Sequence, residues 1–144
     1  MLYTWDVEVD KDDDIITSKK EVPMRLAPGI ITWVSVLFPP GCHGMVKCQI
    51  FHHEHQIFPS RDVMSLSGDG VPIEWSEYYE MYEAPYDLKA RLWGENCTYD
   101  HTVSIRIAVL PRKAIVAQAV VDAIKGAFGM LSPKRIFTRK QGEK

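Results

Sequence analysis

The strongest constraint on the fold is a strict two-residue alternation at residues 102–110. The apolar residues Val103, Ile105, Ile107 and Val109 alternate there with Thr, Ser, Arg and Ala. Because successive side chains of a β-strand point to opposite faces, a period of two gives the strand one apolar face. This segment therefore predicts a strand that packs one face against a core.

Five further segments show the same alternation, and turn sequences separate them. They are residues 3–9, 30–38, 45–52, 73–81 and 88–92, with turns such as Pro39-Pro-Gly41 and Ser67-Gly-Asp-Gly70 between them. Short strands with no helix between them indicate packed antiparallel sheets. We therefore predict a mainly β protein, an antiparallel β-sandwich or jelly-roll-like domain, with one C-terminal helix and extended terminal arms.

The chain after Pro111 changes to a run rich in Ala, Val and Ile, which predicts a helix over residues 114–131. Its apolar stripe is wider than packing against one sheet requires, and alanines four residues apart would let another backbone approach closely. Two interpretations stay open: packing around the axis of a homo-oligomer, or an intramolecular cap on one end of the sandwich. The interface candidates for the first are Val116, Ala119, Val120, Ala123, Ile124, Ala127 and Phe128.

Length and charge suggest how the chain is organised. The 144 residues fit one domain, which we divide into an N-terminal strand and acidic arm (1–22), a β-sandwich core (23–111), the helix (112–131) and a basic tail (132–144). Residues 6–14 hold six acids and one base, and residues 132–144 hold five bases and one acid, so the two ends could pair within a chain or between subunits. The proline-containing segment 21–29 is expected to be an extended arm.

Several classes of partner are not expected. The N-terminus lacks the basic start and long apolar region of a secretory signal, and no apolar run could span a bilayer, so we expect a soluble protein without a membrane partner. The net charge of −2 and the lack of a recognition helix make nucleic acid an unlikely partner.

The chain has an odd number of cysteines, and we expect them to be reduced structural thiols: Cys42, Cys48 and Cys97. No cofactor is expected.

One segment invites a metal hypothesis, because Phe51-His-His-Glu-His-Gln-Ile-Phe58 holds three histidines and a glutamate in four consecutive positions. On a strand, His53 and His55 would point to the same face about 7 Å apart and could share a divalent ion. A His-x-His pair is also typical of cupins, but Pro59 and Ser60 stand where the cupin motif continues with other residues. The competing interpretation is a polar strand end at a surface or subunit contact.

A carbohydrate surface is a second candidate, in the segment 74–83. Aromatic rings stack on sugar faces, and carboxylates accept hydrogen bonds from sugar hydroxyls. The glutamates of this segment could also suggest acid–base catalysis, but their spacing fits an amphipathic strand better. The aromatic candidates are Trp75, Tyr78, Tyr79 and Tyr82.

The order of turn and core residues between positions 23 and 111 resembles that of small β-sandwich proteins encoded among the virion genes of tailed phages and related viruses. The similar stretches are Pro28-Gly-Ile-Ile-Thr-Trp-Val-Ser-Val-Leu-Phe-Pro-Pro-Gly-Cys-His-Gly-Met-Val, Gln56-Ile-Phe-Pro59, Ser67-Gly-Asp69, Pro85-Tyr-Asp-Leu88, Trp93 with Asn96, Tyr99-Asp-His-Thr102 and Arg106-Ile-Ala-Val-Leu-Pro111. The resemblance implies a decoration, spike or other accessory virion protein, a symmetric oligomer bound to a capsid or tail.

These observations favour a non-enzymatic structural protein located in a virion, or otherwise in the cytoplasm. Its expected partners are further copies of itself and other virion proteins. The alternative is a small cupin-like β-barrel that binds carbohydrate through the aromatic segment, or a metal through His53 and His55.

Overall fold

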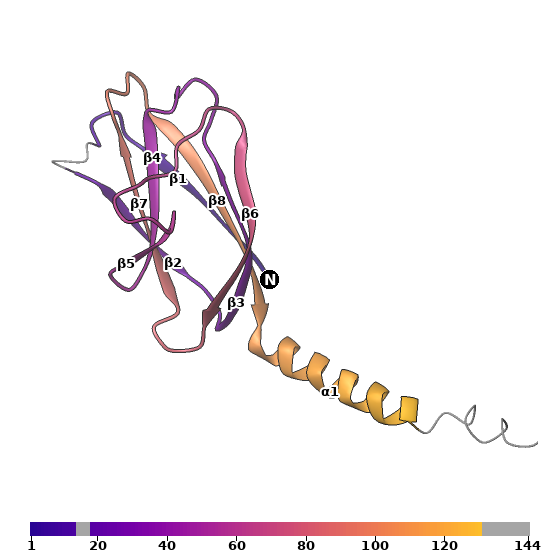
Figure 1. The fold of residues 1–144 in the computed structure, drawn as a ribbon. Coiled ribbons are helices and arrows are strands. Elements are labelled where there is room, and N and C mark those ends of the chain that lie inside the picture. The colour runs from indigo at the N-terminus through magenta and orange to yellow at the C-terminus, as the bar shows by residue number, and fades with distance from the viewer. Residues whose placement is uncertain (14–17, 131–144) are drawn as a thin grey trace, which may run out of the picture. The chain divides into compact units, whose positions relative to one another are not determined.

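Eight strands and one helix make up the part of the chain that the structure describes (Figure 1). The computed structural model describes residues 1–13 and 18–130, without the side chains of residues 115, 118 and 128–130. The predicted basic tail over 132–144 lies outside these residues. The elements are β1 (Leu2–Val9), β2 (Lys20–Arg25), β3 (Gly29–Leu37), β4 (Val46–His52), β5 (His55–Phe58), β6 (Pro72–Met81), β7 (Asp87–Gly94), β8 (His101–Pro111) and α1 (Arg112–Met130).

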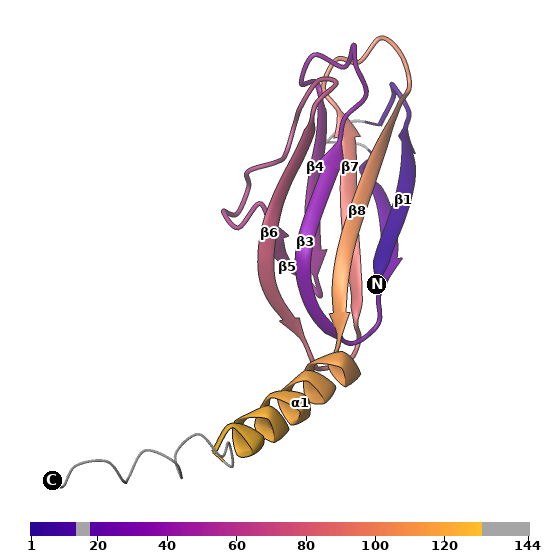
Figure 2. The ribbon, with the colours of Figure 1, turned by 90° about the vertical axis from the view of Figure 1, so that its right-hand side faces the viewer.

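The strands form two four-stranded antiparallel sheets, so the predicted mainly β fold is confirmed. We call the sheet with order β1-β8-β3-β6 sheet A and the sheet with order β2-β7-β4-β5 sheet B. The pairing is nested, because β1 pairs with β8, β2 with β7, β3 with β6, and β4 with β5. Figures 1 and 2 show the two sheets lying face to face in a β-sandwich-like arrangement.

The hydrophobic core lies between the sheets. The alternating segment that predicted a strand is β8, whose Val103, Ile105 and Ile107 are completely buried. Sheet B contributes side chains such as Ile50 and Leu92 to the same cluster. Full burial of an aliphatic side chain of this size stabilises the fold by about 1.5–3 kcal/mol, so these residues hold the sheets together.

The strand predicted over residues 3–9 is confirmed, whereas the expectation that segment 21–29 forms an extended arm is wrong. Residues 2–9 are β1, which pairs with β8 inside sheet A, and β2 is an edge strand of sheet B. Met24 of β2 is fully buried, whereas Pro23 is exposed. A proline is tolerated on an edge strand because the strand has one unpaired side. The alternation of β2 was difficult to recognise in the sequence, because the strand is short and includes the charged residues Lys20, Glu21 and Arg25.

The hairpin of β4 and β5 also differs from the prediction, which ended a strand at His52 and had no strand after it. His52 pairs with His55, and His53 and Glu54 form the two-residue turn between them. β4 is buried on nearly its whole length, on both faces of sheet B. Its outward-facing side chains Gln49 and Phe51 are therefore covered as well.

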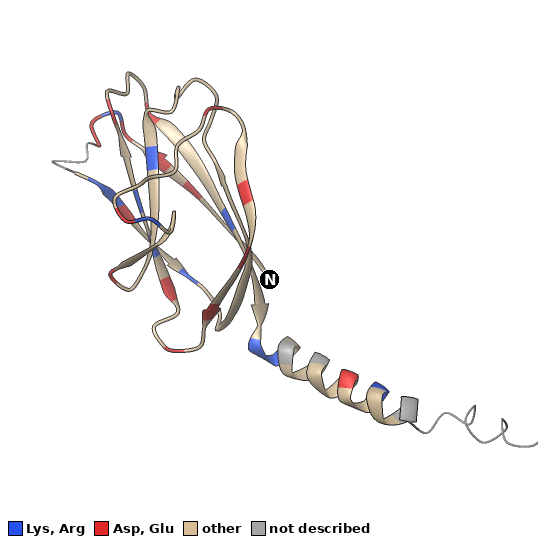
Figure 3. Cartoon of the chain, in the orientation of Figure 1, with Lys and Arg blue, Asp and Glu red and all other residues tan. Residues whose placement is uncertain are grey.

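The helix α1 belongs to a unit separate from the sandwich, which spans Met1–Pro111. It spans Arg112–Met130, so the segment predicted to be a helix is helical as far as the structure describes it. The charged residues of α1 are Arg112, Lys113, Asp122 and Lys125 (Figure 3). Much of the remaining surface of the helix is therefore apolar.

Candidate functional site

His52 is a buried histidine that connects the two sheets. Its Nδ1 lies 2.8 Å from the hydroxyl of Tyr79 on β6, and its Nε2 lies 3.3 Å from the carbonyl oxygen of Pro85. Because a carbonyl only accepts, Nε2 carries the proton and donates to Pro85, and Nδ1 accepts from the Tyr79 hydroxyl. Burial lowers the pKa of His52, against the opposing effect of the hydrogen bond to Pro85. The neutral ring thus serves as a structural link.

The structure does not place His53 and His55 on one strand face, which corrects the geometry assumed for a metal pair. His53 lies in the turn with a φ of 55°, in the left-handed region, and its ring stacks on His52 at a centroid distance of 4.2 Å. His55 begins β5 on the other side of the turn. The reversal of the chain between them removes the same-face argument.

A different group offers metal-type ligands. Within residues 1–13 and 18–130, the one cluster of three such side chains is Glu8, Asp10 and Asp100, whose ligand oxygens lie within 4.8 Å of one another. All three are exposed, and Asp100 already accepts a hydrogen bond of 2.9 Å from the backbone N–H of Lys11. Exposed acidic groups are common on protein surfaces, so we assign no metal to this cluster.

The four aromatic carbohydrate candidates do not share one face. Trp75 and Tyr79 point to the core side of β6, where their rings contact Phe58 at centroid distances of 5.3 and 6.3 Å. Tyr78 points the other way and is 68% exposed, and Tyr82, just beyond the strand, is 37% exposed. Alternation along a strand separates neighbouring side chains. The four rings therefore do not form a single stacking platform.

The edges of the sandwich leave a slot of about 290 Å³ near β5 and β6. Phe58, Leu66, Ile73 and Trp75 give it an apolar lining, and Glu77 lies at its margin. The carboxylate of Glu77 accepts a hydrogen bond of 3.2 Å from the indole N–H of Trp75. This bond fixes the orientation of the tryptophan ring at the slot.

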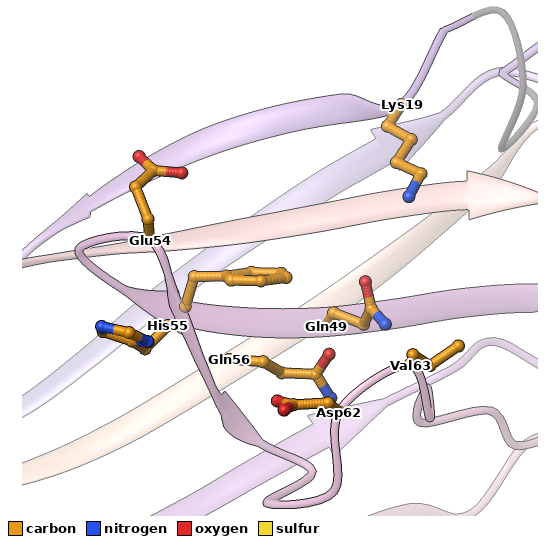
Figure 4. Close-up of a pocket in the computed structure, with 8 residues that line it drawn as sticks. Lys19, Gln49, Glu54, His55, Gln56, Asp62 and Val63 are labelled. Atoms are coloured by element: carbon orange, nitrogen blue, oxygen red, sulfur yellow. The ribbon is translucent and has the colours of Figure 1, made fainter.

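A larger depression, of about 430 Å³, lies on the outer face of sheet B (Figure 4). We call it the sheet-face depression. Its floor includes Gln49 and Phe51 of β4, which point away from the core between the sheets yet are only 7% exposed. Sequence reasoning missed this site. The lining residues are Lys19, Gln49, Phe51, Glu54, His55, Gln56, Asp62 and Val63.

Ion pairs flank the sheet-face depression on β7. Arg91 donates from Nε to Glu21 at 2.6 Å, and its guanidinium lies over the ring of Phe51 at 4.2 Å. Lys89 donates to Glu54 at 3.3 Å. The hydrogen bond from Arg91 holds the pKa of Glu21 below its usual value. These contacts keep Phe51 covered on the β7 side.

The predicted interface residues of α1 are exposed where the structure describes them. Val116, Val120 and Ile124 are 58%, 53% and 51% exposed. Ala119, Ala123 and Ala127 are exposed as well, and the side chain of Phe128 lies outside the described residues. Their separation by three or four residues places them on one broad side of the helix.

No protein-family model, curated protein or solved structure matches this chain. Among the described residues, no helix is long and apolar enough to cross a membrane. The function is therefore inferred from the chain's own residues, above all the exposed helix α1 and the sheet-face depression.

Proposed function

We propose that this protein is a non-enzymatic structural component of a virus particle, which self-associates through α1 and attaches to a capsid or tail. The observation that carries the proposal is the exposed apolar side of α1. Val116, Val120 and Ile124 recur every four residues there, and each is more than half exposed. Nineteen helical residues extend over about 28 Å, enough for a continuous contact with a partner helix.

A second copy of the same chain is the partner that suits this surface best. Ala119, Ala123 and Ala127 would let two helix backbones approach closely, while the valines and Ile124 supply the apolar area. Most protein assemblies of identical chains are symmetric, so the same stripe can cover itself across a rotation axis. The alternative occupant, the chain's own sandwich, would leave the protein monomeric.

The virion role is supported by the resemblance over residues 23–111 and by the strand order. Nested pairing of eight strands in two sheets supports a jelly-roll interpretation, an architecture common in viral capsid proteins and shared with lectins and cupins. Because this architecture serves several functions, the fold alone does not favour one of them. The apolar helix is what favours assembly.

The cupin-like alternative has less support at its original residues. The turn between His53 and His55 and the division of the aromatic segment between two faces of β6 remove the geometry that each binding hypothesis assumed. Saccharide binding is favoured by a specific observation at the sheet-face depression, which is lined by other residues than the original candidates.

Two experiments test the proposal. Sedimentation velocity should show that a chain ending at Pro111 is a monomer, whereas the full chain associates; an equally associated truncated chain would contradict assembly through α1. Mass spectrometry of purified particles from cells that produce this protein should detect its peptides in stoichiometric amounts. Their presence in the cell lysate but not in the particles would contradict the virion role.

A further inference from the structure

The outer face of sheet B is unusual because it is built as a recess rather than as a plain solvated surface. An outward face of an antiparallel sheet is ordinarily polar and exposed. Here Phe51 and Gln49 of β4 face outward and are nearly buried, because the segment that follows β5 covers one side of them. That segment includes Asp62 and the 91% exposed Val63, which line the depression.

Two glutamine side chains hold this covering segment in place. The side-chain nitrogen of Gln56 donates to the carbonyl oxygens of Pro59, Arg61 and Met64 at 2.8, 3.0 and 2.9 Å. The side-chain nitrogen of Gln49 donates to Met64 at 3.0 Å. The wall of the depression is thereby fixed before any ligand arrives, which lowers the entropy that binding must overcome.

The same bonds determine which atoms face the recess. Because the amide nitrogens of Gln49 and Gln56 are engaged by backbone carbonyls, the amide oxygens are the atoms left to act as acceptors. Figure 4 shows the oxygen of Gln49 turned to the side on which Lys19 lies, and Gln56 next to Asp62. The amide oxygens of Gln49 and Gln56 and the exposed carboxylate of Asp62 thus lie in one recess with a cationic donor, Lys19. The Nζ of Lys19 lies 4.9 Å from the centroid of the Trp93 ring.

The charges of the recess select the class of ligand. Glu54 is paired with Lys89 at 3.3 Å and with Arg91 at 3.6 Å, and the recess also holds the carboxylate of Asp62 and the ammonium of Lys19. Its charges are therefore mixed and favour neither an anion nor a cation strongly. A neutral ligand that both donates and accepts hydrogen bonds matches a mixed set of this kind. Phe51 and Val63 offer apolar contacts to its carbon skeleton.

We propose that the sheet-face depression is a binding site for a neutral saccharide. Sugar hydroxyls donate to the oxygens of Gln49, Gln56 and Asp62 and accept from Lys19, while a sugar C–H face packs on Val63 and the accessible edge of Phe51. A volume of about 430 Å³ suits one or two sugar rings. The site lies wholly in the sandwich and does not depend on assembly through α1.

The test is saturation-transfer NMR on the full-length protein with maltose, cellobiose, lactose and N,N′-diacetylchitobiose, each at up to about 10 mM, the range in which weak affinities are measured. We expect at least one disaccharide to bind. Asp62→Ala should weaken that binding by about tenfold, the loss typical of a hydrogen bond to a charged group. Both Asp62 and the control position, Glu74 on β6, are exposed, so neither substitution should unfold the chain.

A second variant, Gln49→Leu, removes the amide oxygen from the floor and should abolish the signal. Its folded state is checked by the amide proton spectrum, and Asp62→Ala decides the matter if Gln49→Leu does not fold. Glu74→Ala should bind as the parent protein does. The proposal is overturned if none of the four disaccharides binds, if Asp62→Ala binds as well as Glu74→Ala, or if inorganic phosphate binds in the depression in place of sugar.

Discussion

Introducing charge on the apolar side of α1 should abolish self-association without affecting the sandwich. The change is the double substitution Val120→Asp and Ile124→Asp. Full burial of such side chains contributes about 1.5–3 kcal/mol each, and about half of each is exposed, so covering the remainder contributes about 1 kcal/mol per residue. Two residues in each of two chains give about 4 kcal/mol per dimer.

A loss of about 4 kcal/mol weakens a dissociation constant by about 1,000-fold. Aspartate adds to this loss, because an unpaired charge in an apolar contact is strongly unfavourable. Valine and aspartate have similar helix propensities, so the helix itself should be little affected by the change at residue 120.

The assay is sedimentation equilibrium over a range of protein concentrations, with Lys125→Asp as the matched control. Lys125 is exposed and lies away from the stripe formed by Val116, Val120 and Ile124, so aspartate there adds negative charge without entering the contact. The control should associate as the parent chain does. If the double variant associates as strongly as the control, the assignment of the interface to this side of α1 is refuted.

Three further expectations concern the sandwich. Gly29→Ala should lower the free energy of unfolding in urea by about 1–3 kcal/mol, because the added Cβ would overlap the carbonyl group of Leu110; an unchanged transition midpoint would contradict this. The folded-state pKa of His52 lies below the ordinary 6.5, so the unfolded chain binds more protons and stability should fall as the pH drops below 6.5. His52→Gln should flatten that dependence in pH-resolved urea titrations, and an identical slope would refute the assignment. Burial raises the pKa of the Cys48 thiol to about 12, so iodoacetamide should label it only after unfolding, as peptide mass spectrometry can check; equal labelling in the native state would contradict its burial.

The sequence predicted the strands that carry a long alternation and missed the short ones at the edges. β8 and β6 alternate over many residues, whereas β2 is short and contains a proline and several charges. β5 has only four residues and follows directly after a tight turn. Edge position alone does not explain this, because β6 is also an edge strand; β2 and β5 are short, so few residues carry their pattern.

The candidate site was harder to predict because it depends on a turn and on a covering segment. His53 adopts a positive φ in the turn, a conformation that glycine or asparagine usually adopts. The residue type therefore did not predict the turn. Gln49 and Gln56 belong to no sequence motif that would have marked them as binding residues. One feature of the sequence could have indicated the depression. Phe51 on β4 and Trp93 on the neighbouring β7 are large apolar residues at outward-facing positions, where an antiparallel sheet is ordinarily polar.

The most direct test of the central claim, self-association through α1, is the mass of the full-length protein in solution, measured by size exclusion with light scattering. The chain has a mass of 16.5 kDa. Self-association through α1 predicts a discrete mass that is an integral multiple of this value, two or greater. A mass of 16.5 kDa at every concentration measured would contradict it, because the apolar side of α1 would then need no second copy.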